Sequence, residues 1–187
     1  MILGKVFKNI NPKYKQIKFN NIKFNSKECK FNDIFFAISG NKKDGNKFIN
    51  DAIKNGAKII VSNLKFKDFN KKNILFIHSK DPRNTLAEAA SNFYSKKPKN
   101  IIAVTGTNGK TTTTHIIEHL GTSVGKSLAL FGTLVNRWPS HSETSIHTTG
   151  FSDVFHAQLA QAFKAGANIA AVEVSSHALA QNRLSGC

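Results

Sequence analysis

The chain has 187 residues, enough for one or two domains with a substantial core, and 40% of them are apolar. No apolar run approaches the roughly 18 residues that a membrane span needs, and the N-terminus lacks a secretory signal pattern. Cys29 and Cys187 are too few for a disulfide framework. We therefore expect a reduced, cytoplasmic protein with no membrane partner.

The net charge of +16 is distributed unevenly. Residues 1–100 hold 22 Lys and Arg against 7 Asp and Glu, whereas residues 101–187 hold 5 against 4. A basic half can indicate a nucleic-acid partner, but these lysines are scattered and no nucleic-acid-binding motif accompanies them. We expect a basic solvated surface whose field favours an anionic ligand, and no nucleic-acid partner.

The first hundred residues predict a small α/β unit. Alternating or continuous apolar residues predict strands over residues 15–26, 33–39, 58–63 and 73–79. Helical spacing predicts one helix over 46–57, ending at Gly56, and a second that opens at Asp81 and Pro82. The polar stretch before residue 98, where the charge balance changes, predicts domains over residues 1–98 and 99–187.

The second half alternates strands with helices, which predicts an α/β domain with a parallel sheet of the phosphate-loop type. Strands are expected over residues 100–105, 127–132 and 168–175, and helices over 110–120 and 151–165. The polar segment 133–150 holds the only tryptophan and two histidines, His141 and His147. The spacing of these histidines gives no support to a metal site. We expect a surface loop there, of the kind that often binds ligands.

A glycine-rich stretch, Gly106-Thr107-Asn108-Gly109-Lys110-Thr111-Thr112, lies between a predicted strand and a predicted helix. Such loops bind phosphates because backbone N–H groups and the helix N-terminus attract anions. Lys110 would reach the β- and γ-phosphates, and the Thr111 hydroxyl would bind Mg²⁺. Val104 stands where the longer form of the motif has its first glycine, and an ordinary turn before a helix is the alternative reading.

Glu173 lies near the end of the apolar run 168–175, which places a carboxylate at the carboxyl edge of the predicted sheet. Ligands gather at that edge, and a buried carboxylate without a partner is costly. We therefore expect a Mg²⁺ ligand; the alternative is an acid that backbone donors satisfy.

Taken in order, "GTNGKTTT", "TTG" and "EVSSHALAQNR" resemble the Mur ligase family, the ATP-dependent amide-forming enzymes of peptidoglycan synthesis. Residues 25–57 are similar to the uridine-nucleotide-binding domain of that family. Asn25 and Lys27 stand where the family has Asp and Arg, and Asn32 replaces a glycine.

The resemblance implies a role for each matching residue. Gly106 through Thr112 would bind ATP, Thr111 and Glu173 would bind Mg²⁺, and Lys110 and Glu173 would serve catalysis. Residues that would contact the UDP-sugar are Ser26, Asn41, Lys42 and Lys43. Residues that would contact the muramoyl-dipeptide are Thr148, Thr149, Ser175, Gln181 and Arg183.

The implied reaction adds a diamino acid, with meso-diaminopimelate favoured over L-lysine, to UDP-N-acetylmuramoyl-L-alanyl-D-glutamate through an acyl phosphate. We expect a monomeric N-terminal fragment of such an enzyme that does not ligate alone. Besides a basic nucleic-acid binder, which the scattered lysines disfavour, two alternatives remain. One is another ligase of the superfamily, such as a folylpolyglutamate synthetase or the dipeptide-adding ligase. The other is a non-catalytic nucleotide- or UDP-sugar-binding module.

Overall fold

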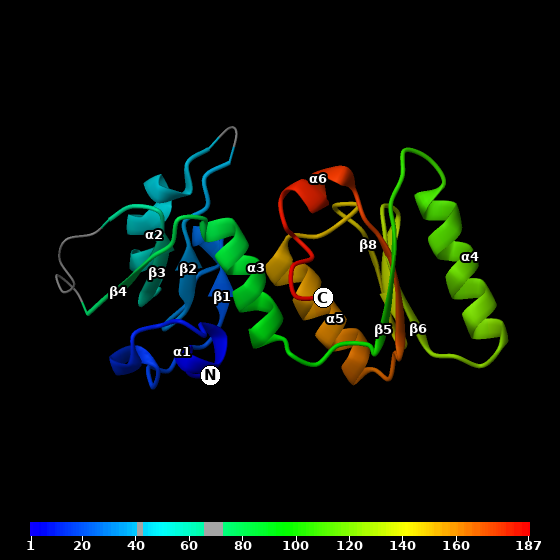
Figure 1. The fold of residues 1–187 in the computed structure, drawn as a ribbon, viewed down its shortest axis with the longest axis horizontal. Helices are drawn as coiled ribbons and strands as arrows, with labels where there is room; N and C mark the ends of the chain where they lie inside the picture. The colour runs from blue at the N-terminus through cyan, green and yellow to red at the C-terminus, as the bar shows by residue number, and fades with distance from the viewer. Residues whose placement is uncertain (41–42, 66–72) are drawn as a thin grey trace. The chain divides into compact units, whose positions relative to one another are not determined.

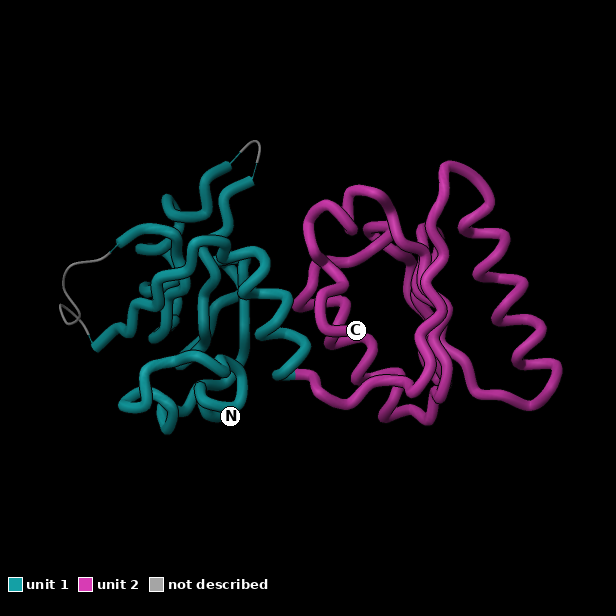
Figure 2. Tube along the Cα trace, in the orientation of Figure 1, with its two compact units in different colours: residues 1–93 teal, residues 94–187 magenta. Residues whose placement is uncertain are grey.

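The computed structural model describes residues 1–40, 43–65 and 73–187. Within these ranges the chain forms two compact units, residues 1–93 and residues 94–187 (Figure 2). Each unit is a sheet covered by helices, which confirms the predicted α/β class (Figure 1). None of the helices in the described ranges is long and apolar enough to cross a membrane.

The first unit is built on a four-stranded parallel sheet in the order β1-β2-β3-β4. Its strands are β1 (Ile22–Lys23), β2 (Ile34–Phe36), β3 (Ile59–Ser62) and β4 (Leu75–His78). Its α-helices are α1 (Leu3–Val6), α2 (Ile49–Lys54) and α3 (Pro82–Phe93). Three 3-10 helices complete it: η1 (Pro12–Tyr14), η2 (Ser26–Glu28) and η3 (Gly45–Phe48).

The sequence explains most of these elements. Successive residues of β2 and β3 are buried on alternate faces, so both faces of the sheet carry core, as in parallel sheets covered by helices. Helix α3 begins at Pro82, and Asp81 Oδ1 accepts the N–H groups of Arg83 and Asn84, as its N-cap position predicts. The long strand expected over 15–26 is wrong, because only two of its residues pair in the sheet.

The second unit holds a five-stranded sheet in the order β5-β9-β6-β7-β8. Its strands are β5 (Asn100–Val104), β6 (Leu128–Phe131), β7 (Val135–Trp138), β8 (His141–Thr144) and β9 (Ile169–Glu173). Its helices are α4 (Lys110–Ser123), α5 (Ser152–Lys164) and α6 (Ser176–Ala180). Strands β5, β9 and β6 are parallel, whereas β7 and β8 are antiparallel. The sheet is therefore mixed.

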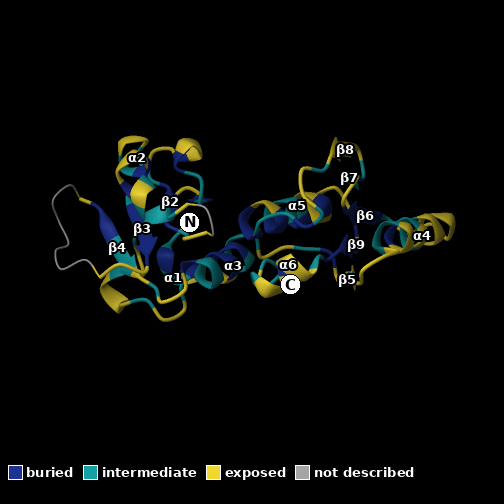
Figure 3. Cartoon of the chain, turned by 90° about the horizontal axis from the view of Figure 1, so that it is seen from above, coloured by how far each residue is buried: buried dark blue, intermediate teal, exposed yellow. Residues whose placement is uncertain are grey.

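Helices cover both faces of this sheet (Figure 1). On one face, Phe155 and Leu159 of α5 pack with Phe131 of β6 and Val172 of β9 in a single apolar cluster. On the other face lies α4, whose outer side is exposed to solvent (Figure 3). Strands β6 and β9 are thus buried from both sides, and the loops of interest begin at their carboxyl ends.

The surface loop expected over residues 133–150 is wrong in its middle, where β7 and β8 form a hairpin. Trp138 is 7% exposed and packs against Phe131, with ring centroids 5.8 Å apart. Arg137 donates through Nε to Glu118 of α4 at 2.6 Å, and its Nη2 also contacts that carboxylate. An apolar anchor and an ion pair therefore attach the hairpin to the rest of the unit.

Candidate active site

The stretch from Gly106 to Thr112 connects the carboxyl end of β5 to the first turn of α4. Gly106 has φ +146° and Gly109 has φ +81°, a backbone region that favours glycine. A Cβ at Gly109 would meet nothing within 4 Å, so the backbone conformation and not crowding requires glycine there. These glycines turn the chain sharply from strand into helix.

The first turn of α4 presents backbone donors. Within the described ranges, no hydrogen bond connects the N–H groups of Lys110, Thr111 and Thr112 to a protein acceptor, whereas Thr113 N–H bonds Gly109 O at 2.9 Å. Gly109 is the N-cap and offers no side chain to them. Orphan N–H groups and the positive end of the helix dipole together attract an anion.

Lys110 lies against the same loop. Its Nζ donates to the carbonyl oxygen of Gly106 at 2.7 Å and is 3.4 Å from that of Thr107. The ammonium group is thus placed beside the exposed turn, where it adds a full positive charge to the partial charges of the amides.

Glu173 is the last residue of β9 and is completely buried. Its Oε2 accepts the hydroxyl of Thr111 at 3.0 Å and that of Thr133 at 2.9 Å. Its Oε1 accepts the backbone N–H of Thr133 at 3.0 Å. Because a buried carboxylate needs such donors, this pattern accounts for its burial and fixes its orientation beside the phosphate-type loop.

Gly132 makes room for this carboxylate. A Cβ at position 132 would overlap Oε1 of Glu173 and lie 2.9 Å from its Cδ. Any larger residue would therefore displace the acid.

The structure gathers the residues assigned to the muramoyl-dipeptide around the end of β9. The Thr149 hydroxyl is buried, donating to Glu173 O at 2.9 Å and accepting from Ser175 N–H at 3.1 Å. Arg183 donates to Thr149 O at 2.8 Å and to Gln181 Oε1 at 2.8 and 3.0 Å. The Thr149 hydroxyl therefore joins the loop before α5 to the end of β9.

The hydroxyls of two other members of that set make bonds of their own. The Ser175 hydroxyl caps α6 by accepting Ala178 N–H at 3.1 Å. Thr148 is only half-buried, and its hydroxyl oxygen lies 3.1 Å from that of Thr133. Sequence reasoning missed Thr133, because a threonine in a polar segment gives no signal of its own.

In the first unit, Ser26 follows β1 and Lys43 lies in the segment after β2. These strands are neighbours and parallel, so both residues belong to the carboxyl edge of that sheet, where ligands of α/β folds bind. Ser26 is buried and Lys43 is exposed. Asn41 and Lys42 lie outside the described residues.

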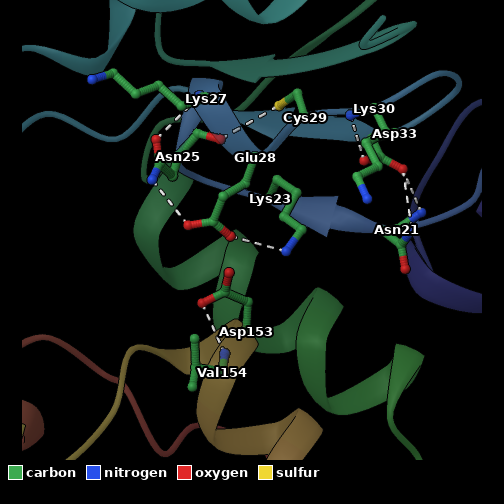
Figure 4. A network of polar contacts seen from close by, with 10 residues as sticks. All are labelled: Asn21, Lys23, Asn25, Lys27, Glu28, Cys29, Lys30, Asp33, Asp153 and Val154. Atoms are coloured by element: carbon green, nitrogen blue, oxygen red, sulfur yellow. Dashed lines mark hydrogen bonds and ion pairs between the residues drawn. The ribbon is translucent and has the colours of Figure 1, made fainter. Parts of the chain in front are cut away.

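Two of the three departures from the family pattern, Asn25 and Asn32, have local explanations. Asn25 caps η2 by accepting Lys27 N–H at 3.1 Å, and its amide contacts Glu28 at 2.9 Å (Figure 4). Lys23 donates to the same carboxylate at 3.0 Å and lowers the pKa of Glu28 (Figure 4). Asn32 has φ +65°, a conformation that asparagine tolerates better than most residues, which accounts for it in place of glycine.

Cys29, His141 and His147 do not come together as a second site. Burial raises the pKa of Cys29 to about 12, which keeps it a neutral thiol. His141 stacks on Trp138 at 4.2 Å, and His147 contacts Phe151 edge-on. No group of three His, Cys, Asp or Glu side chains in the described ranges could hold a metal ion.

Comparison with known families matches both units. The "Mur ligase family, catalytic domain" model matches residues 18–94, and the "Mur ligase middle domain" model matches residues 104–187. The chain belongs to the Mur ligase family. These matches agree with the resemblance inferred from the sequence motifs.

Individual Mur ligases support the same placement. The chain is 44% identical over 178 residues to the UDP-N-acetylmuramoyl-L-alanyl-D-glutamate--2,6-diaminopimelate ligase of Prochlorococcus marinus, covering 92% of this chain and 35% of the relative. A solved structure of a ligase of that name is 28% identical, with a TM-score of 0.83, covering 100% of this chain and 38% of its own. The chain thus spans about a third of the length of these relatives.

A more distant likeness concerns the fold alone. The MurF ligase of Thermotoga maritima, solved in complex with ADP, is 24% identical with a TM-score of 0.54, covering 83% of this chain and 32% of its own.

Proposed function

We propose that this Mur ligase chain supplies the UDP-sugar-binding and ATP-binding parts of an ATP-dependent ligase. Its reaction would join a diamino acid, diaminopimelate in our assignment, to UDP-N-acetylmuramoyl-L-alanyl-D-glutamate. Relatives that carry this activity in their names support the substrate assignment. The observation that carries the proposal is the hydrogen bond between Thr111 and the buried Glu173, beside the N-terminal amides of α4.

The residues present fit ATP and Mg²⁺. The amides of Lys110, Thr111 and Thr112 would hold phosphate oxygens, with the Lys110 ammonium beside them. The Thr111 hydroxyl donates its proton to Glu173. The lone pairs of the Thr111 oxygen thus remain for a cation such as Mg²⁺, which prefers oxygen ligands. Bound Mg²⁺ would neutralise negative charge on the transferred phosphoryl group.

The chemistry follows from the inertness of a carboxylate toward amines. The γ-carboxylate of the D-glutamyl residue would attack the γ-phosphorus of ATP, forming an acyl phosphate and releasing ADP. The amine of the diamino acid would then attack the acyl carbon, and inorganic phosphate would leave. In this chain, Lys110 would stabilise charge on the phosphoryl oxygens, and Glu173 would hold the metal in place.

The remaining assignments rest on the resemblance and on position. Ser26 and Lys43, together with Asn41 and Lys42, would contact the UDP-sugar from the first unit. Thr148, Thr149, Ser175, Gln181 and Arg183 would meet the dipeptide from the segments before α5 and after β9. We assign the reaction to the cytoplasm, catalysed by a monomer.

Calorimetric titration of the 187-residue chain with a non-hydrolysable ATP analogue tests the proposal. Binding that strengthens with Mg²⁺ is expected, and a folded chain that takes up no nucleotide would contradict it. A second titration compares UDP-N-acetylmuramoyl-L-alanyl-D-glutamate with a folate. Binding of the folate alone would instead favour a folylpolyglutamate synthetase.

A further inference from the structure

Thr133 hydrogen-bonds both carboxylate oxygens of Glu173. The backbone N–H of Thr133 donates to Oε1 at 3.0 Å, and its hydroxyl lies 2.9 Å from Oε2. Thr111 contributes one bond, at 3.0 Å to Oε2. A carboxylate bound at both oxygens by one residue cannot rotate about its last torsion without losing a bond. Thr133 therefore contributes most to the orientation of this acid.

We propose that Thr133 is the positioning residue that aims Glu173 at the Mg²⁺ of the bound nucleotide. This inference rests on the proposed function, because it assigns a support to the acid of that site. Groups that hydrogen-bond a metal ligand commonly set its orientation and change metal affinity about 10- to 100-fold when removed.

The proton count fixes the direction of these bonds. Thr133 Oγ1 lies 2.9 Å from Glu173 Oε2 and 3.1 Å from Thr148 Oγ1, but a hydroxyl has one proton. The hydroxyl of Thr133 donates to the carboxylate of Glu173, so its one proton is used there. Thr148 can then donate to Thr133. A chain of hydroxyls consequently runs from the "TTG" loop to the acid, and each bond polarises the next.

Positioning can be separated from folding at this residue. Thr133 is exposed, so its methyl group contributes little to the core. Thr133→Val keeps the shape and the backbone N–H but removes the hydroxyl, while Thr133→Ser keeps the hydroxyl. Thr144, an exposed residue of β8 in the same hairpin, offers the matched change Thr144→Val.

The experiment measures the affinity of the 187-residue chain for a non-hydrolysable ATP analogue by calorimetry, once with Mg²⁺ and once with EDTA. The ratio of the two affinities is the gain due to Mg²⁺. Thr133→Val is expected to lower this gain about tenfold while leaving the affinity in EDTA unchanged. Thr133→Ser should restore the gain, and Thr144→Val should match the unmodified chain.

Three results would overturn the inference. If Thr133→Val keeps the full Mg²⁺ gain, the inference fails and the proposed function stands. Equal losses with Mg²⁺ and with EDTA would assign Thr133 a structural role instead. If the unmodified chain binds no nucleotide in either condition, the proposed function fails and this inference fails with it.

Discussion

The Thr111 hydroxyl donates to the Glu173 carboxylate at 3.0 Å, although 62 positions separate the two residues in the sequence. Thr111 lies in the first turn of α4 and Glu173 ends β9, so the bond connects the segment after one strand to the end of its neighbour. The parallel pairing of β5 with β9 places both at the same edge. This contact brings the proposed phosphate-binding and metal-binding groups together.

Replacing Lys110 tests the charge at the loop. Lys110→Ala is expected to weaken binding of a non-hydrolysable ATP analogue roughly tenfold to a hundredfold, because it removes a charged donor from the phosphates. Calorimetry measures the loss. Lys126→Ala removes the same charge from an exposed position after α4 and should leave the affinity within about twofold. Equal effects of the two changes would show a general field and no specific contact.

Glu173→Gln tests the metal ligand. The amide keeps the size of the side chain but loses the negative charge, so the strengthening of nucleotide binding by Mg²⁺ should fall by about tenfold or more. The affinity measured in EDTA should change little, because the phosphate-binding amides remain. A variant that retains the full response to Mg²⁺ would remove Glu173 from the metal site.

Gly132→Ala tests the close approach of backbone and acid. The added Cβ would overlap the Glu173 carboxylate, so we expect a loss of about 1–3 kcal/mol in the free energy of unfolding. Urea denaturation followed by fluorescence of Trp138, the only tryptophan, reports on this unit. Gly150→Ala is the matched control, since its Cβ would meet its nearest atom at 3.6 Å. Equal stability of the two variants would contradict the proposed overlap.

His156 predicts how stability depends on pH. Burial, with a smaller contribution from Lys97, lowers the pKa of His156 to about 4 from 6.5, against the opposing bond to Ser185 O. The unfolded chain therefore binds the proton more readily than the folded one. The contribution of His156 to the free energy of unfolding is therefore fully present above pH 6.5. As the pH falls toward 4, up to about 3 kcal/mol of this free energy is lost.

Urea denaturation at pH 7 and at pH 4.5 checks this dependence. His156→Gln removes the titrating group, and its amide can still donate to Ser185 O, so the variant should lose less stability on acidification. His177→Gln changes an exposed histidine and should behave as the unmodified chain does. Identical acid sensitivity in all three proteins would show that other groups control it.

The sequence predicted the elements that carry their own signal. Gly109-Lys110-Thr111 lies between an apolar strand and a helix, and Glu173 interrupts an apolar run at its end, so local pattern and position agree. The hairpin has no such signal, because β8 is exposed throughout and Trp138 reads as an isolated apolar residue. Thr133 was missed for a related reason, since its importance comes from a carboxylate 40 positions away.

Strand β5 is an edge strand of its sheet, yet it lacks the charged residues and prolines that usually protect edge strands from pairing with other strands. Ile102 is 40% exposed. Ile116 and Leu120 of α4 are 52% and 61% exposed, and Val124, which follows the helix, is 71% exposed. Unpaired backbone groups flanked by apolar side chains recruit further strands, from the same molecule or from another copy. Self-association of the isolated chain should therefore increase with concentration, and ultracentrifugation can define the range in which the titrations report on single molecules.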